Sequence, residues 1–425
     1  MRILVVGSGG REHAIAWAFS KSPRTTKLYC AKGNAGIAEI AETVDIGPED
    51  ILALAEFAQE KKIDLTFVGP ENSLAAGIVD EFQSRGLRIV GAGKDAARLE
   101  ASKSFAKEFM SRHSIPTAAF AVADSAEEAV SFLESGRFGG ESAPVVVKAD
   151  GLAAGKGVVV CRSRSEAVEA VRSLTEGEIV SADAARTIVL EECLVGKEIS
   201  VILFADGKNF ALMPPARDHK RIGEGDTGPN TGGMGVVSDP SLLSADQRDM
   251  IIEEIIRPTI EGSSEEGFPF SGILFVGLMM TESGPKVLEY NVRFGDPETQ
   301  AILVNLETDL VDISEAMIEG SLDRQIISWK EGSAACVILA AENYPAQPRT
   351  GDRIEGLDEA GKHECVEIFH AGTAHDDHKE VVTSGGRVLA VTATASNLSN
   401  ALHRAYKAVN ELSWPGMQYR SDIGK

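Results

Sequence analysis

The sequence predicts an α/β protein with an N-terminal doubly wound parallel sheet, a central module of two α+β subdomains and a small C-terminal mixed α/β domain. Three observations predict this architecture. At 425 residues the chain is several times the usual domain size, which indicates about three domains. Strand and helix signals alternate through the N-terminal quarter, and the C-terminal quarter carries strands followed by a helical stretch.

The N-terminal part, residues 1–102, alternates short apolar runs with stretches of helical spacing. We expect strands at ILVV, KLYCA, DLTFV and RIVGAG, and helices at REHAIAWAF, EDILALAEFAQ and LAAGIVDEFQ. Short apolar runs that end at Gly or Pro are typical of buried strands. Strands that alternate with helices in this way predict a parallel sheet covered on both faces.

The central part, residues 103–325, divides into two subdomains. A smaller one, over about 116–190, precedes the long strand candidates EISVILF, ILFVGLMM and KVLEYNV. The last part, residues 326–425, contains AACVILAAENYP, HECVEIFHAGTA and GRVLAVTATA, followed by the helical stretch LSNALHRAYKAVNEL. We therefore expect strands and a terminal helix in a compact C-terminal domain.

Composition excludes several classes of protein. The formal net charge of −22 and the lack of a Lys/Arg cluster argue against nucleic-acid binding. The five cysteines include no CxxC pair, so neither a disulfide framework nor a zinc site is indicated. No apolar run approaches the length of a membrane span, and the start MRILVVGSGG breaks at glycines unlike a signal peptide. We expect a cytoplasmic protein that does not bind membranes.

The segment KADGLAAGKGVVV, residues 148–160, is rich in glycine but is not a Walker-type phosphate loop. The position that should be Gly, five residues before Gly155, is Asp150, and Gly157 replaces the hydroxyl residue that should follow Lys156. Valines follow where a helix should begin. The pattern predicts a loop between two strands, which could lie over a nucleotide as a flap.

The segment VVGSGGREHA places Gly7, Gly9 and Gly10 between a strand and a helix that begins near Arg11. Such a turn can offer backbone N–H groups and the positive end of the helix to an anion. The third glycine of a dinucleotide fingerprint is replaced by Glu12, so NAD is not expected. A single phosphate of a sugar phosphate is the functional interpretation, and a tight turn without a ligand is the alternative.

The segment KVLEYNVRFGDPETQ, residues 286–300, combines a strand with a polar turn. On a strand, Glu289 and Asn291 point to one face and offer two oxygen ligands to Mg²⁺. Arg293 continues that face, and the chain then turns into a helix. The alternative is an acidic strand edge that is only solvated.

Two further segments carry weaker signals. ARDHKRIGEGDTGPNTGGMG, residues 216–235, has neither helical nor strand periodicity, and a loop of this length is usually functional or disordered. Its cations could hold phosphate or carboxylate, and a solvated surface loop is the alternative. In TIVLEECLVGKEISVILF, residues 191–194 could pair their backbone with an adenine edge while Glu198 reaches ribose hydroxyls; an ordinary strand–turn–strand unit is equally consistent.

Taken in order, GSGGREHA, KADGLAAGKG, EECLVGKEIS, DHKR, GPNTGGMG and LEYNVRFGDPETQ resemble the ATP-grasp enzymes of purine synthesis, and among them the phosphoribosylamine–glycine ligase family. The resemblance covers essentially the whole chain, including HAGT and TSGGRVLAVTA. It implies a central ATP-grasp module over residues 103–325, and ligation of glycine to 5-phosphoribosylamine with ATP through a glycyl phosphate. It also implies Mg²⁺ or Mn²⁺ as the metal. We expect small-molecule partners only, and a monomer.

The resemblance also implies roles for particular residues. Contacts to ATP would come from Lys103, Lys148, Gly155, Lys156, Gly157, Glu191, Leu194 and Glu198. Metal ligands would be Glu289 and Asn291. Substrates would meet Gly9, Gly10, Arg11, Asn230 and Asp296, with Asp218, Lys220 and Arg293 as catalytic residues.

Two features depart from the family pattern or from the wider superfamily. Arg217 stands where the family often has Gln, so the role of that side chain is open. The strand SGILFVGLMM offers no acidic metal ligand, so phosphates and water must complete the metal shell. Two other functions stay open: another ATP-grasp carboxylate–amine ligase or carboxylase, and an ATP-binding regulatory module without catalysis.

Overall fold

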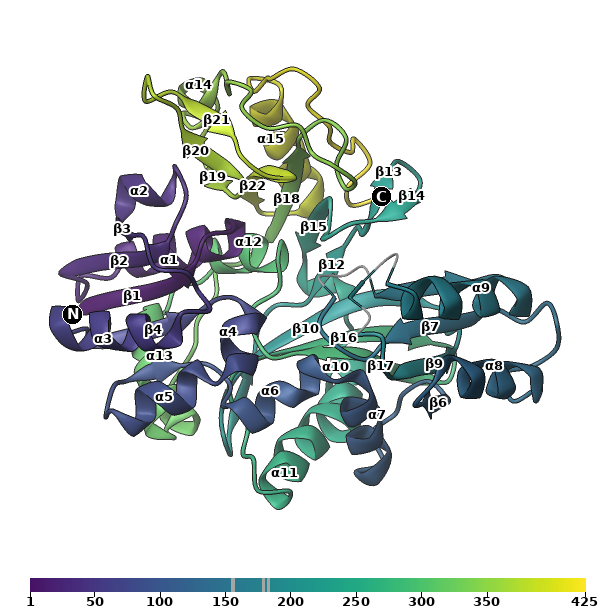
Figure 1. Cartoon of the computed structure of the whole chain (residues 1–425). Helices are drawn as coiled ribbons and strands as arrows, with labels where there is room; N and C mark the ends of the chain where they lie inside the picture. Colours follow the sequence, from purple (N-terminus) through teal and green to yellow (C-terminus); the bar gives the residue numbers. More distant parts are fainter. Residues whose placement is uncertain (154–156, 178–179, 182–183) are drawn as a thin grey trace.

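The computed structural model describes residues 1–153, 157–177, 180–181 and 184–425. Figure 1 shows the N-terminal sheet on the left, the subdomain with β6–β9 on the right and the C-terminal domain at the top. The predicted α/β class is confirmed. Gly155 and Lys156, which were predicted to contact ATP, lie outside the described residues.

The N-terminal sheet is parallel throughout and has the order β3-β2-β1-β4-β5. Its strands are β1 (Arg2–Gly7), β2 (Lys27–Lys32), β3 (Glu42–Val44), β4 (Leu65–Val68) and β5 (Ile89–Val90). Its helices are α1 (Gly10–Ser20), α2 (Ile37–Ile40), α3 (Ile51–Lys61), α4 (Glu71–Ala76), α5 (Ile78–Ser84) and α6 (Lys94–Ala101). The strand order reverses between β1 and β4, and doubly wound folds bind ligands at the carboxyl ends of such strands. The turn at Gly9 and the start of α4 both lie there.

The smaller subdomain is an antiparallel sheet of order β6-β9-β7-β8 covered by two helices. Its elements are β6 (Phe120–Ala123), α8 (Ala126–Glu134), β7 (Val145–Ala149), β8 (Val158–Cys161), α9 (Arg164–Thr175) and β9 (Ile188–Glu192). Helix α7 (Lys103–Arg112) leads into it. Lys148 pairs with Val158 across β7 and β8, which confirms that the glycine-rich segment joins two neighbouring strands. The subdomain packs around a hydrophobic core of its own.

The largest sheet has the order β17-β16-β10-β12-β15-β18-β22-β19, with β11 beside β10. The central part of the chain contributes β10 (Lys197–Asp206), β11 (Phe210–Leu212), β12 (Ala216–Asp218), β15 (Gly235–Ser238), β16 (Ser271–Thr281) and β17 (Gly284–Asn291). Its helices are α10 (Ala245–Ile251), α11 (Arg257–Glu265), α12 (Glu298–Leu303) and α13 (Leu310–Glu319), with a π-helical turn (Ile252–Ile256) between α10 and α11.

The expectation of a structureless loop over residues 216–235 is wrong. This segment forms β12, β15 and a separate hairpin of β13 (Arg221–Gly223) and β14 (Thr227–Asn230). Each of these strands is only three or four residues long, so periodicity cannot reveal them. β12 and β15 are specified by their pairing with the large sheet instead.

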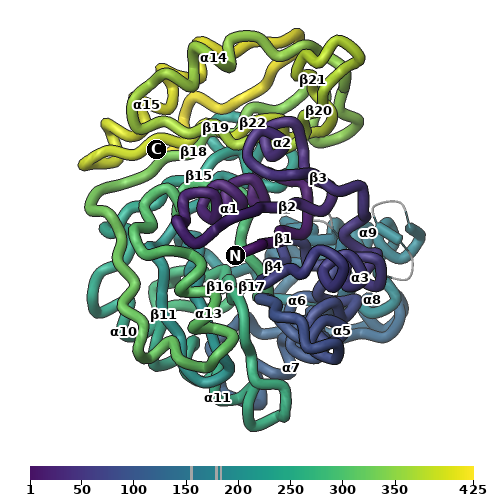
Figure 2. The backbone as a smooth tube through the Cα atoms, turned by 90° about the vertical axis from the view of Figure 1, so that its left-hand side faces the viewer, coloured from purple at the N-terminus to yellow at the C-terminus, as the bar shows by residue number. Residues whose placement is uncertain are grey.

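The C-terminal part supplies β18 (Ser333–Ala340), α14 (Leu357–Ala360), β19 (Val366–His370), β20 (Thr373–His375), β21 (Val381–Thr383), β22 (Arg387–Ala395) and α15 (Leu398–Val409). β18 pairs with β15, so the large sheet continues from the central module into this part. The boundaries at 102/103 and 325/326 stay predictions. Figure 2 shows the C-terminal part above α1 and α2, and α1 packs against β19.

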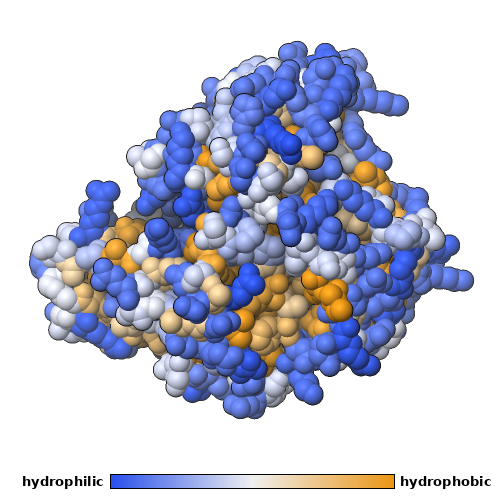
Figure 3. Space-filling view, turned by 180° about the vertical axis from the view of Figure 1, so that it is seen from behind, coloured by the Kyte–Doolittle hydropathy of each residue, from blue (hydrophilic) through white to orange (hydrophobic). Residues whose placement is uncertain are grey.

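The face seen in Figure 3 is mostly polar, with apolar residues in separate patches. Among the described residues, large apolar side chains with high exposure include Ile326 and Val195, at 84% and 82%. They are far apart in sequence, and scattered exposed apolar residues of this kind are ordinary. None of the described helices has both the length and the apolar character needed to cross a membrane.

Two buried histidines join the N-terminal and C-terminal parts. His13 on α1 accepts a hydrogen bond at Nδ1 from the backbone N–H of His370, at 2.8 Å. The His370 ring lies 3.1 Å from the hydroxyl of Thr373. Burial lowers the pKa of His13 to about 3 and that of His370 to about 4. The contact therefore depends on neutral rings.

This junction predicts a loss of stability in mild acid. Below about pH 6.5 the unfolded chain binds more protons than the folded protein at these two positions, so the free energy of unfolding should fall as the pH falls towards about 4. His13→Asn keeps an acceptor but cannot titrate. When the pH falls from 7 to 5, the free energy of unfolding in urea should fall by about 1 to 2 kcal/mol less in this variant than in the parent protein. Equal losses would show that His13 does not couple folding to pH.

Candidate active site

Glu289 lies on β17, opposite Gly277 of β16, and Asn291 lies two residues further along the same face. Within the described part of the chain, no ion pair or hydrogen bond engages the Glu289 carboxylate. Burial alone would raise its pKa, but Lys220, Lys148 and Lys103 lower it below the usual value. Glu289 is therefore an ionised carboxylate that no described residue engages, and it can accept a cation.

The three lysines reach Glu289 from different elements. Lys103 begins α7 and donates to the carbonyl oxygen of Gly151 at 3.2 Å. Lys148 lies on β7 and donates to the carbonyl oxygen of Leu288 at 3.1 Å. Lys220 follows β12, and its Nζ lies 3.1 Å from Glu198 Oε2. All three were predicted as site residues, and the structure brings them together.

Glu191 is enclosed by two lysines. Its Oε1 lies 2.7 Å from Lys148 Nζ and its Oε2 lies 3.0 Å from Lys107 Nζ, and all three side chains are buried. Burial lowers the pKa of Lys107 to about 8 despite the attraction of Glu191. The backbone of Glu191 pairs with β6 and β7 on either side. The carboxylate of Glu191 therefore holds Lys148 in position, and the role of Glu191 towards adenine and ribose stays a prediction.

The predicted adenine slot lies where β9 leads into β10. Leu194 is half-buried in the turn between these strands, and Glu198 on β10 is exposed except for its pair with Lys220. Gly157, at the start of β8, is buried and accepts a backbone hydrogen bond from Ala149 at 2.8 Å. The roles of Leu194, Glu198 and Gly157 towards ATP stay predictions.

Arg293 follows β17, and most of its guanidinium N–H groups have partners within the protein. It lies 3.1 Å from Glu71 Oε2 and 2.8 Å from Glu100 Oε1, and it donates to Asn291 Oδ1 at 3.1 Å. With a further bond to the carbonyl oxygen of Phe294, contacts to described residues leave one N–H of the guanidinium for a ligand. Burial raises the pKa of Glu100 to about 7, whereas the arginines beside Glu71 lower its pKa to about 2.

Asp218 and Glu298 form a second group of buried carboxyls. Asp218 ends β12, and Glu298 begins α12 and accepts from the Ser200 hydroxyl at 3.0 Å. Burial raises the pKa of both groups, and their mutual repulsion raises that of Asp218 further. Lys220 lies close enough to oppose both shifts. A small ammonium group beside these two carboxyls would favour their ionised forms.

Asp296 connects three parts of the chain. Its carboxylate lies 3.0 Å from Arg387 Nη2 on β22 and accepts from Gln300 at 2.7 Å. Arg387 also donates to the carbonyl oxygens of Asp296 and Gly232. A side chain on Gly9 would come within 3.5 Å of the Asp296 carboxylate. The N-terminal turn, the segment after β17 and the C-terminal part therefore meet at Asp296.

The N-terminal turn is partly occupied by the chain's own carboxylate. Glu12 Oε2 accepts from the N–H of Gly9 at 2.6 Å, and Glu12 Oε1 lies 2.6 Å from Arg11 Nε. Arg11 also donates to the carbonyl oxygen of Phe294. Gly10 begins α1 with its Cα facing Gln300. An anion at this turn would therefore have to share or displace Glu12.

Two predicted positions lie apart from this cluster. Asn230 is exposed at the end of β14 and pairs with Arg221, and no side-chain bond joins it to the other predicted site residues that the structure describes. Arg217 precedes Asp218 on β12, so the two side chains point to opposite faces. Arg217 donates to the carbonyl oxygen of Lys425 at 3.2 Å, away from the lysine cluster.

A divalent metal ion fits the Glu289 face chemically. Glu289 supplies an ionised oxygen ligand, and Asn291 supplies an amide oxygen that already accepts from Arg293. No cluster of three or more His, Cys, Asp or Glu side chains suited to a metal ion occurs among the described residues. Phosphate oxygens and water would have to complete such a metal shell.

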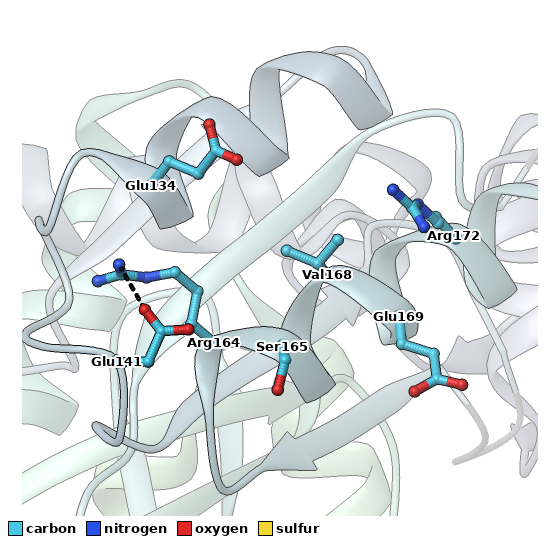
Figure 4. Close-up of a pocket in the computed structure, with 7 residues that line it drawn as sticks. All are labelled: Glu134, Glu141, Arg164, Ser165, Val168, Glu169 and Arg172. Carbon is cyan, nitrogen blue, oxygen red and sulfur yellow. Dashed lines mark hydrogen bonds and ion pairs between the residues drawn. The ribbon is translucent and has the colours of Figure 1, made fainter.

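A hollow between α8 and α9 lies outside this site. Figure 4 shows that it is polar, with Arg164 Nη1 3.5 Å from Glu141 Oε2. None of the predicted site residues lines it.

Sequence reasoning missed several residues of the cluster, namely Glu71, Glu100, Lys107, Glu298 and Arg387. Glu298 and Arg387 lie within quoted segments, DPETQ and SGGRV, so a local signal existed for those two. The other three lie in ordinary helical stretches. Only the fold brings them to the site.

The fold and the lysine-lined site define an ATP-grasp protein. The chain matches the family model for the phosphoribosylglycinamide synthetase N domain over residues 1–100, the ATP-grasp (A) domain over 101–299 and the C domain over 334–425. A biotin carboxylase from Campylobacter jejuni has a TM-score of 0.74 at 17% identity over 98% of this chain and 92% of that one, which shows the shared fold alone.

The chain belongs to the phosphoribosylglycinamide synthetase family. It is 48% identical to a phosphoribosylamine–glycine ligase of Brucella melitensis, over 100% of this chain and 97% of the relative. It is 46% identical to the ligase of Vibrio parahaemolyticus, over 100% and 98%. The crystal structure of the Thermotoga maritima ligase has a TM-score of 0.86 at 34% identity and covers 100% of both chains. The family resemblance predicted from the motifs is confirmed.

Because Glu191 is enclosed, we expect two substitutions of paired charges to lower the free energy of unfolding by very different amounts. Lys107→Met leaves a buried carboxylate with one partner and should lower the free energy of unfolding by about 3 kcal/mol. Glu192→Gln removes a more exposed pair with Lys286 and should cost about 1 kcal/mol or less. Adding Glu191→Gln to Lys107→Met should restore part of the loss. Chemical denaturation measures all three, and equal costs for the two single variants would contradict the role given to Lys107.

Proposed function

We propose that this chain joins glycine to 5-phosphoribosylamine at the expense of ATP, giving glycinamide ribonucleotide, ADP and phosphate. The observation that carries this proposal is the cluster of Lys103, Lys148 and Lys220 around the ionised carboxylate of Glu289, which has no partner among the described residues. The family and the names of its full-length relatives support the same reaction. In this reaction the carboxylate of glycine attacks the γ-phosphate, and the amine of phosphoribosylamine then displaces phosphate from glycyl phosphate.

The lysines suit phosphoryl transfer because they concentrate positive charge where phosphate oxygens would lie. Lys148 is held by Glu191 and by the carbonyl oxygen of Leu288, so little rearrangement is needed when ATP binds. Lys103 contacts the backbone at the base of the glycine-rich segment. Glu289 and Asn291 would hold a Mg²⁺ or Mn²⁺ ion, which would supply positive charge to stabilise the phosphates during transfer.

Glycine would lie between Lys220 and the two buried carboxyls. Its ammonium group would meet Asp218 and Glu298, whose pKa values are raised first of all by burial, and would favour their ionised forms. Its carboxylate would then face Lys220 and the free N–H of Arg293. This orientation points the nucleophilic oxygen towards the lysine cluster.

Phosphoribosylamine would bind at the N-terminal turn, where Gly9, Arg11 and Asp296 meet. This edge of the parallel sheet is the place where doubly wound folds bind ligands. We further propose a monomeric, cytoplasmic enzyme. Another ATP-grasp ligase or a carboxylase is the alternative, since the fold is shared with a biotin carboxylase.

The first test is the substrate dependence of ADP formation. ADP should form at a substantial rate only when glycine and phosphoribosylamine are both present, because both small substrates must complete the site. Coupled ADP release with each substrate alone and with both together measures this. Equal turnover with bicarbonate or D-alanine in place of glycine would exclude the proposed reaction.

The second test concerns Glu289. Glu289→Gln should lower turnover about 100-fold or more while the melting temperature is maintained, because it removes the charged ligand of the metal. Turnover is measured across a Mg²⁺ titration, with Glu282→Gln in the exposed turn between β16 and β17 as the matched control. Near-normal turnover for Glu289→Gln would place the metal elsewhere.

A further inference from the structure

Arg420 is a buried arginine that lies outside the cluster around Glu289. Its side chain is 2% exposed, and it belongs to a segment after α15, residues 420–424, that runs beside the β13–β14 hairpin. Arg420 Nη1 lies 2.7 Å from Asp226 Oδ1 and donates to the carbonyl oxygen of Arg221 at 3.1 Å. Asp422 accepts two further bonds from the same guanidinium, at 2.8 and 2.9 Å.

The same segment also holds the tip and the base of the hairpin. At the tip, the N–H of Gly225 donates to Asp422 Oδ2 at 2.8 Å. At the base, the N–H of Gly424 donates to His219 Nε2 at 3.1 Å, while His219 Nδ1 lies 3.1 Å from the carbonyl oxygen of Gly235. A side chain on Gly235 would come within 2.7 Å of Ile423, so packing is tight there.

The hairpin needs such support. β13 and β14 form a two-stranded sheet of their own, and every residue of β14 is exposed. A hairpin without a third strand or a packed face is marginal in water. Lys220 immediately precedes it, and the backbone oxygen of Lys220 accepts from Thr231 just after it. The position of Lys220 therefore depends on the conformation of the hairpin.

We propose that Arg420 is a positioning residue for the reaction: with Asp422 it fixes the β13–β14 hairpin, and the hairpin fixes Lys220 where glycine binds. The contribution to catalysis rests on the proposed function, whereas the contribution to the hairpin does not. The buried guanidinium is stable because its N–H groups are paired with the hairpin and with Asp422. Removing the guanidinium removes these bonds and should release the hairpin. A lysine cannot replace the planar guanidinium, whose N–H groups bond Arg221, Asp226 and Asp422 at once.

The test compares Arg420→Met and Arg420→Lys with Arg404→Met. Arg404 on α15 donates to the carbonyl oxygen of Thr394 and does not touch the hairpin, so its substitution reports on general effects in the C-terminal part. Hydrogen–deuterium exchange on the free protein should be about tenfold faster over residues 221–230 in both Arg420 variants, with β16 and β17 unchanged. Arg404→Met should leave the exchange of the hairpin unchanged.

Steady-state kinetics give the second measurement. In Arg420→Met, kcat/KM for glycine should fall about 10- to 100-fold, because a displaced Lys220 would no longer orient glycine. The KM for ATP should change less than about twofold, because Lys103 on α7 and Lys148 on β7 lie outside the hairpin and would still bind the nucleotide. The kcat/KM for glycine of Arg420→Lys should lie between the values of Arg420→Met and the parent protein. Faster hairpin exchange with unchanged glycine kinetics would overturn the positioning role.

If Arg420→Met does not fold, Asp226→Ala tests the role of the ion pair in holding the hairpin. Its side chain is 69% exposed, so it cannot disrupt a core, and it should accelerate hairpin exchange to a smaller extent. Unchanged exchange in Asp226→Ala and in any folded Arg420 variant would overturn the proposal. A parent protein that forms no ADP with both substrates would refute the proposed reaction, while the exchange result would still test the hold on the hairpin.

Discussion

The meeting of Lys103, Lys148 and Lys220 at the buried carboxylate of Glu289 is the constraint on which the rest of the site depends. Buried charges are costly unless they are compensated. The chain compensates them from the outside. Lys148 pairs with Glu191 and Lys220 with Glu198, and each carboxylate holds its lysine without occupying the space near Glu289. A strongly acidic protein thereby presents a local positive site to a nucleotide.

This arrangement explains why so many elements meet in one place. Lys103 begins helix α7 and Lys148 lies in the small sheet. Lys220 follows β12 of the large sheet, and Glu289 lies near the end of β17 in that sheet. The C-terminal part contributes as well, since Arg387 joins Asp296 to Gly232 and the N–H of Gly232 reaches the hydroxyl of Tyr344. The C-terminal part is therefore a component of the site and not an appendage.

The sequence predicts the local features well and the long-range ones poorly. The strand–loop–strand character of KADGLAAGKGVVV and the shared face of Glu289 and Asn291 follow from short-range periodicity, and the structure agrees. The partner of Glu191 does not follow, because Lys107 is far away in sequence and looks like an ordinary surface lysine. The hairpin over residues 221–230 escapes detection for a related reason, since its support comes from the far end of the chain.

The central claim is that the lysine cluster directs a carboxylate of glycine onto the γ-phosphate of ATP. The most direct measurement uses glycine labelled with ¹⁸O in its carboxylate and follows the isotope into inorganic phosphate by mass spectrometry. If glycyl phosphate forms, the C–O bond breaks when the amine attacks, and each phosphate released carries one labelled oxygen from glycine. Unlabelled phosphate, with glycinamide ribonucleotide still formed, would contradict the account.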